Sequence, residues 1–314
     1  MDLMADIGAT NTRCALLNDK GRELAAEVFQ NADFTGIGGL LSVYLDHRRA
    51  TDRPKGAALA VAAPILGDEV HMINIDWRFS QTALKRELGL RKLTVCNDFA
   101  AIAWGLPHFR AADLRTIGGG KAAARGTLAA LGPGSGLGVA ALVPAVDGWA
   151  VLTGEGGHVT LPAVTPEEVD VIALIRDRYD GHCSAERVLT GPGLVNLYVA
   201  LAELAGRGRP TVTPTDVTAL AKQGEPLARK AQGMFFAFLG TVAGDLALTT
   251  GARGGVFVAG GIVPQLVDEA VRSEFRARFE AKGRYSDYMA GIPTHVITAP
   301  QPAFRGLRML LGYR

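Results

Sequence analysis

Two segments that share one design constrain the fold of this chain more than any other feature. In each, a short apolar strand leads into a tight turn of small residues, and a second apolar strand follows. The first segment covers residues 3–17 and the second covers residues 127–143. This order is typical of β-hairpins. Because the spacing is far too long for a solenoid repeat, we predict two related halves that each supply one glycine-containing turn.

Apolar strands alternate with helical patterns through most of the remaining chain. Residues 57–62, 93–96 and 256–259 are continuous apolar runs, as expected of buried strands. We predict a surface loop over residues 207–214, and helices over residues 82–90, 165–175, 194–204, 227–248 and 263–271, with a further helix that starts at residue 99. The alternation predicts an α/β fold with mixed sheets, and the length of 314 residues favours two domains.

Charge and composition exclude several classes of partner. Lys and Arg total 33 and Asp and Glu total 31, without a long block of one sign, so neither nucleic acid nor a membrane surface is an expected partner. We expect no membrane span, because Gly or charged residues interrupt every long apolar stretch. The cysteines Cys14, Cys96 and Cys183 are scattered, which argues against disulfides or a zinc knuckle. The N-terminus lacks a leader pattern, so we expect a cytoplasmic protein.

The first turn combines a strand-end carboxylate with backbone amides that can bind an anion. It consists of Asp6, Ile7, Gly8, Ala9, Thr10 and Asn11. Successive N–H groups in such a turn form a concave anion site, to which Thr10 and Asn11 add donors for a phosphate. Asp6 is a candidate for holding Mg²⁺, directly or through water. A plain hairpin turn would have the same residues, so this segment alone leaves both interpretations open.

The second turn has four glycines in the seven residues 132–138, which let the backbone approach a bulky, charged ligand. It lacks the features of a Walker loop and of a dinucleotide fingerprint, and the alternative is a strained turn. Because the first turn offers a similar site, we interpret Gly134, Ser135 and Gly136 of the second turn as one side of a clamp on a polyphosphate. Gly260 and Gly261 follow a buried strand and can accommodate a nucleotide's base or ribose, although strand–Gly–helix connectors are common.

A third group of residues suits a ligand with hydroxyl groups. Asn97 and Asp98 end a buried strand, where Asp98 can accept a proton from a sugar hydroxyl that Asn97 orients, or can cap a helix. Glu155 and His158 lie among three glycines, and we interpret them as hydrogen-bonding a polyol. Metal binding is the alternative there, but the expected cysteine cluster is missing. Glu186 adds a sugar contact or forms a surface pair with the arginine that follows it.

Taken together, seven segments in register resemble the bacterial glucokinase family. They are residues 6–13, 63–68, 97–99, 134–139, 154–159, 186–194 and 259–264. The resemblance implies a two-domain, ribonuclease-H-like fold of the actin and hexokinase type, with ATP and sugar in an interdomain cleft. It implies a small domain of residues 1–108 plus 298–314 and a large domain of residues 109–297.

The same resemblance implies ATP-dependent phosphorylation of glucose to glucose 6-phosphate by a homodimer that uses Mg²⁺. Asp98 would be the general base. The hexose would be bound by Asn97, Asp98, Glu155, His158 and Glu186, and phosphate by Gly8, Thr10, Asn11, Gly134 and Ser135. The alternatives are a kinase for another hexose or an amino sugar, and a non-catalytic sugar-sensing regulator on the same fold. The chain departs from the family at Ala9, where a second glycine is usual, and in the tail at residues 301–306.

Overall fold

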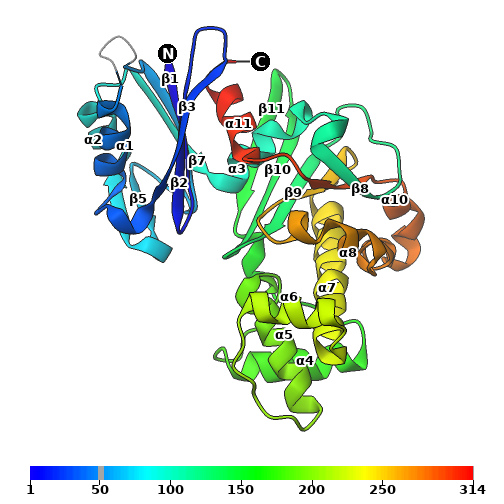
Figure 1. Cartoon of the computed structure of the whole chain (residues 1–314). Coiled ribbons are helices and arrows are strands. Elements are labelled where there is room, and N and C mark those ends of the chain that lie inside the picture. The colour runs from blue at the N-terminus through cyan, green and yellow to red at the C-terminus, as the bar shows by residue number, and fades with distance from the viewer. Residues whose placement is uncertain (49–52, 314) are drawn as a thin grey trace. The chain divides into compact units, whose positions relative to one another are not determined.

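The structure is a computed structural model that describes residues 1–48 and 53–313 of the chain. It divides into two compact units, each containing strands and helices (Figure 1). Unit 1 comprises Met1–Arg110, Val151–Gly154 and Ala299–Arg314, and unit 2 comprises Ala111–Ala150 and Glu155–Thr298. The domain boundaries that the sequence suggested stay a prediction.

The sheet of unit 1 has five strands in the order β3-β2-β1-β4-β7. The strands are β1 (Asp2–Ile7), β2 (Asn11–Leu17), β3 (Glu23–Gln30), β4 (Gly56–Val61) and β7 (Lys92–Asn97). The first three pair antiparallel, whereas β1, β4 and β7 run parallel to one another. Every residue of β4 is buried, which explains its continuous apolar sequence. The parallel strands therefore end at one common edge of this sheet.

Helices and a small hairpin complete unit 1. They are α1 (Ile37–Asp46), α2 (Gln81–Glu87), α3 (Asp98–Gly105), α11 (Pro302–Leu310), β5 (Glu69–Met72) and β6 (Trp77–Ser80), with 3-10 turns η1 (Asn31–Asp33), η3 (Ile73–Ile75) and η4 (Leu106–His108). The tail helix α11 packs directly on α3. A Cβ atom at Gly306 would lie 1.7 Å from the Ala101 carbonyl oxygen, so this contact requires glycine. The unusual tail thus packs closely against the helix that begins at Asp98.

The sheet of unit 2 repeats the design of the first. Its strand order is β11-β10-β9-β12-β13-β8. The strands are β8 (Leu114–Gly118), β9 (Leu128–Pro133), β10 (Leu137–Ala145), β11 (Gly148–Gly154), β12 (Gly255–Val258) and β13 (Thr294–Ile297). The last part of β11, Val151–Gly154, is counted with unit 1. Strands β9 and β10 form an antiparallel hairpin, and β9, β12 and β13 run parallel. Each unit therefore places a tight turn beside the carboxyl ends of parallel strands, as the repeated hairpins predicted.

The helices of unit 2 pack mainly around its long apolar helix. They are α4 (Pro166–Asp177), α5 (Gly191–Leu204), α6 (Pro214–Gln223), α7 (Pro226–Thr250), α8 (Val267–Arg272), α9 (Phe275–Glu280) and α10 (Ser286–Ala290), with 3-10 turns η5 (Ala111–Asp113), η6 (Gly156–His158), η7 (Ala185–Arg187), η8 (Val263–Leu266) and η9 (Gly283–Tyr285). The capping box expected before α4 is present at Thr165 and Glu168. The single helix predicted over residues 263–271 is wrong in detail, because residues 263–266 form the 3-10 turn η8 and the α-helix α8 begins only at Val267.

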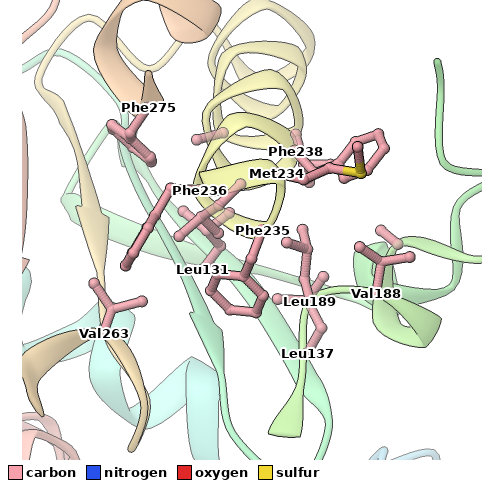
Figure 2. Packing of buried hydrophobic residues seen from close by; sticks show 14 of the residues in the cluster. Leu131, Leu137, Val188, Leu189, Met234, Phe235, Phe236, Phe238, Val263 and Phe275 are labelled. Atoms are coloured by element: carbon pink, nitrogen blue, oxygen red, sulfur yellow. The ribbon is translucent and has the colours of Figure 1, made fainter. Parts of the chain in front are cut away.

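Helix α7 is the core of unit 2. By length and composition alone it would suffice to cross a membrane, but 67% of its most apolar window is buried in the structure, so it is a core helix of unit 2. Figure 2 shows Phe235 and Phe236 projecting from α7 toward Leu131 of β9, with Val188 and Leu189 beyond Phe235. These contacts identify α7 as the buried helix that supports the sheet.

Candidate active site

Two carboxylates lie at the common strand edge of unit 1. Across the parallel strands, Asp6 of β1 is aligned with Ala60 of β4, and Ala60 with Cys96 of β7. Burial, together with the negative charges of Asp98 and Asp6, raises the pKa of Cys96 to about 12, so both carboxylates lie near this thiol. Burial also raises the pKa of Asp6 to about 6, although the charge of Arg13 opposes the rise.

Asn97, rather than Asp98, caps helix α3. The Asn97 side-chain oxygen accepts hydrogen bonds from the backbone N–H groups of Phe99 (2.9 Å) and Ala100 (3.2 Å). Asp98 is the first residue of the helix, and its Oδ1 accepts from the Phe99 N–H at 2.8 Å. The cap interpretation of Asp98 is therefore wrong. Its carboxylate stands at a helix N-terminus, where negative charge is favourable.

A buried asparagine shapes the first turn. The Asn31 side chain donates to the Gly8 carbonyl (2.8 Å), and its backbone N–H donates to the Thr10 carbonyl (2.9 Å). The Thr12 hydroxyl donates to the Asn31 side-chain oxygen at 2.7 Å, and Asn31 is only 4% exposed. Sequence reasoning missed Asn31, because it is 19 to 23 residues from the groups it contacts and has no local signature.

The turn itself suits a hydrated cation and an anion. Ala9 is absent from the described non-glycine residues with positive φ, so its methyl group is compatible with the turn. The side-chain oxygen of Asn11 is buried without a hydrogen-bond partner in the structure described. That oxygen and the Asp6 carboxylate are of the type that Mg²⁺ prefers. No cluster of three or more metal-binding side chains occurs among the described residues, so nucleotide oxygens and water would have to supply the other ligands.

Close backbone packing shapes the second turn. Within it, the Gly134 N–H donates to the Gly136 carbonyl at 2.9 Å. Gly260 has φ +86°, and a Cβ there would lie 2.2 Å from the Pro133 carbonyl oxygen. Only glycine lets the end of β12 approach β9 this closely. Gly261 is different, because it is exposed and has nothing within 4 Å of its Cβ position.

The three predicted sugar contacts of unit 2 lie on or directly before two adjacent 3-10 turns. Turn η6 carries His158 and follows Glu155, and η7 carries Glu186. The turns contact each other, and the Ala185 N–H donates to the Val159 carbonyl at 2.9 Å. Glu155 and His158 are exposed, whereas Glu186 is half-buried. The structure thus brings these three side chains to neighbouring positions.

Glu186 does not take part in the surface pair considered as its alternative. Its Oε2 atom accepts a hydrogen bond from the Leu137 backbone N–H at 2.9 Å. The guanidinium of Arg187 instead lies over the Tyr179 ring, 4.0 Å from its centroid. Leu137 is the first residue of β10, directly after the glycine turn. The Glu186 carboxylate therefore lies at the end of the predicted phosphate turn.

Unit 1 thus assembles Asp6, the turn before β2, Asn97 and Asp98 along one sheet edge. Unit 2 assembles the glycine turn, the three side chains of Glu155, His158 and Glu186, and the glycines after β12. The family model of glucokinase matches residues 3–313 of this chain. The chain belongs to the glucokinase family.

Individual relatives agree with this assignment. A glucokinase of Paramagnetospirillum magneticum is 46% identical over 313 residues, with 99% of this chain and 97% of the relative covered. The crystal structure of a glucokinase from an Antarctic psychrotroph matches with a TM-score of 0.88 and 34% identity, covering 99% of this chain and 98% of that one. The family resemblance and the two-unit α/β fold predicted from sequence are confirmed.

The fold extends to more distant sugar kinases. A ROK family glucokinase from Streptomyces griseus, crystallised with glucose and AMPPNP, has a TM-score of 0.66 at 18% identity, with 98% of each chain covered. This likeness shows the common fold. Both sheets of this chain are mixed, with an antiparallel hairpin joined to parallel strands.

Proposed function

We propose that this protein transfers the γ-phosphoryl group of ATP to the 6-hydroxyl of glucose, producing glucose 6-phosphate and ADP. The observation that carries the proposal is the match to the glucokinase family over residues 3–313, together with a carboxylate at the N-terminus of α3. Curated relatives that cover almost the whole chain are named glucokinase. The alternative of a non-catalytic regulator is not favoured, because Asp98 is present.

Asp98 is the proposed general base. In an in-line transfer, the bond between the γ-phosphorus and the bridging oxygen of ATP breaks as a bond to the sugar oxygen forms. Asp98 takes the hydroxyl proton late in this step. Two backbone N–H groups hold the oxygen of Asn97, and its amide nitrogen donates to the Ala63 carbonyl at 3.4 Å, which leaves the second N–H of that nitrogen for a sugar hydroxyl. In unit 2, Glu155, His158 and Glu186 accept or donate hydrogen bonds to the hexose.

The two turns are the proposed phosphate-binding elements. Backbone N–H groups and short polar side chains would hold the phosphates at Gly8, Ala9, Thr10, Asn11, Gly134, Ser135 and Gly136. Gly260 and Gly261 would lie against the nucleoside. Asp6 and the unpartnered oxygen of Asn11 would hold Mg²⁺, directly or through water. When bound, the cation neutralises charge that develops on the phosphates.

Membership of this family also supports three expectations about partners, compartment and oligomeric state. We propose that the partners of this protein are a small sugar and a nucleotide, that it acts in the cytoplasm, and that it is a homodimer. The near-equal totals of 33 basic and 31 acidic residues support small-molecule rather than nucleic-acid partners.

A sugar panel tests the proposed activity. ADP release is measured with ATP and Mg²⁺ in the presence of glucose, mannose, fructose, galactose, glucosamine and N-acetylmannosamine, with a sugar-free reaction as control. Glucose should give the highest kcat/KM. A higher value for another sugar would support the kinase alternative, and the absence of any sugar-dependent release would overturn the proposal.

A further inference from the structure

We propose that Glu186 is a positioning residue for the glycine turn, so that one carboxylate serves both the sugar and the nucleotide. This inference rests on the proposed function, which assigns Glu186 to the hexose and residues 134–136 to phosphate. The structure adds a second contact of the same side chain, the hydrogen bond from the Leu137 N–H to its Oε2 atom at 2.9 Å. All groups involved belong to unit 2.

The carboxylate fills the space beside the turn. A Cβ atom added to Gly136 would lie 2.8 Å from Glu186 Oε2. Since real Cβ contacts are longer than this, a side chain at position 136 and the observed position of the carboxylate exclude each other. A glycine at this position therefore allows the carboxylate to approach the backbone. The Glu186 carboxylate therefore contacts the turn through close packing against Gly136 as well as through its hydrogen bond to Leu137.

The segment that carries Glu186 is firmly anchored. Ala185, Val188 and Leu189 are completely buried, and Figure 2 shows Leu189 beside Phe235 and Leu137 in the core. The carbonyl of Glu186 accepts a hydrogen bond from the Thr190 hydroxyl at 2.9 Å. A carboxylate on such a fixed turn can hold a neighbouring loop in place, which a side chain on a mobile segment cannot do.

The same segment also holds the other end of the turn. The Gly191 N–H, at the start of α5, donates to the Gly134 carbonyl at 3.2 Å. The turn is thus held near Gly134 by a backbone hydrogen bond and at Leu137 by the Glu186 side chain. Of these two contacts, only the Glu186 contact involves a group that is also assigned to the sugar.

This arrangement predicts coupling between the two ligands. The Leu137 N–H bonds to Oε2, which leaves Oε1 for a sugar hydroxyl. A sugar that fixes this carboxylate also fixes the end of the phosphate turn, so each ligand should strengthen binding of the other. The coupling is reciprocal by thermodynamic linkage. Without sugar, Glu186 still shapes the turn, so its removal should weaken nucleotide binding directly.

Calorimetric titration of the full chain with AMPPNP and Mg²⁺, without sugar, tests the inference. Glu186→Ala should weaken binding about tenfold, because it removes a hydrogen bond to a charged group. Glu186→Gln should stay within about threefold of wild type, since its amide oxygen can accept from the same N–H. The matched control Glu155→Ala removes a sugar contact on the adjacent turn and should leave AMPPNP affinity unchanged.

Equal AMPPNP affinity in Glu186→Ala and wild type would overturn the inference, as would an equal loss in Glu186→Ala and Glu186→Gln. If Glu186→Ala does not fold, Gly136→Ala carries the test, because its methyl group displaces the carboxylate. It should weaken AMPPNP binding, and unchanged affinity would contradict the inference. A wild type that binds AMPPNP without phosphorylating glucose would overturn the proposed function alone, and one that binds no nucleotide would overturn both.

Discussion

The two units use one sheet design but end their strands with different chemistry. In unit 1, β1 ends at Asp6–Ile7, and Asn97 and Asp98 follow the apolar part of β7. In unit 2, β9 ends in glycine and proline, and Gly260 follows β12. Unit 1 thus presents carboxylates at its strand ends, whereas unit 2 presents closely packed backbone. Under the proposed function, the same topology would supply proton and cation chemistry in one unit and anion-binding backbone in the other.

The units also differ in how they hold their turns. In unit 1, the buried side chain of Asn31 links Gly8 of the turn to Thr12 of β2. In unit 2, the turn is held by Glu186 and by the direct approach of Gly260 to Pro133. Unit 2 also contains a buried ion pair between two helices, Glu168 of α4 and Arg278 of α9. Substitutions in this pair should change stability, whereas substitutions at the strand ends of unit 1 should change activity.

The largest effect on stability is expected for Glu168→Gln. Arg278 contacts both carboxylate oxygens, at 2.6 and 3.0 Å, and the two residues are 9% and 3% exposed. Leaving the guanidinium unpaired should lower the free energy of unfolding by about 3–5 kcal/mol. The matched control is Glu167→Gln, which breaks an exposed pair with Lys230 and should cost less than about 1 kcal/mol. Chemical denaturation measures both, and equal losses would contradict this account.

Acid should act through the same pair. Burial alone would raise the pKa of Glu168, but hydrogen bonds from Arg278 and from the Val164 N–H outweigh it, so the pKa is lowered. The stabilisation is therefore complete above the ordinary glutamate pKa of 4.5 and is lost as pH falls through the lower folded value. Unfolding measured between pH 6 and about 3 should show a steeper acid loss in wild type than in Glu168→Gln.

Gly260→Ala should have the next largest effect. The added methyl group would meet the Pro133 carbonyl oxygen, and the backbone has a φ of +86°. We expect a loss of about 2–4 kcal/mol, or a shifted turn with a raised KM for ATP. Gly261→Ala is the control, since nothing lies near its Cβ position, and its unfolding free energy should stay within about 0.5 kcal/mol of wild type. Similar melting temperatures for the two variants would disprove the close-packing explanation.

Asn31→Ala should have an intermediate effect on unit 1. It removes the side chain that bonds to Gly8 and Thr12, so we expect a loss of about 1–3 kcal/mol and a raised KM for ATP. Asn18→Ala is the control, because Asn18 accepts from Lys20 and Arg22 in the exposed turn between β2 and β3. It should leave the KM for ATP unchanged. The comparison fails if both variants alter that KM equally.

The smallest effect is expected for Ala9→Gly. Because the described backbone does not place Ala9 among residues with positive φ, glycine there adds only unfolded-state entropy. Stability should fall by less than about 1 kcal/mol, and kinetic constants for ATP should not change. A marked improvement in kcat/KM for ATP would show that the methyl group obstructs the turn.

Local signals in the sequence predicted the elements that such signals determine. Both hairpins, the apolar strands and the capping box at Thr165 were predictable, because each depends on residues that are close in sequence. Helix α6 was missed although Thr213 and Asp216 form the same kind of box, because the preceding residues read as a loop. The long-range contacts that hold the turns were not predictable. Asn31 and Gly260 act on chain segments that are distant in sequence.

The central claim is that Asp98 takes a proton from the sugar, and one substitution tests it most directly. In Asp98→Asn, the amide oxygen can still accept from the Phe99 N–H and Asn97 still caps α3, so the fold should be preserved. Glucose binding and ATP-dependent turnover are measured on the same preparation. We expect kcat to fall by about 10²–10⁴-fold, with a dissociation constant for glucose close to that of wild type. Turnover near the wild-type rate would contradict the account.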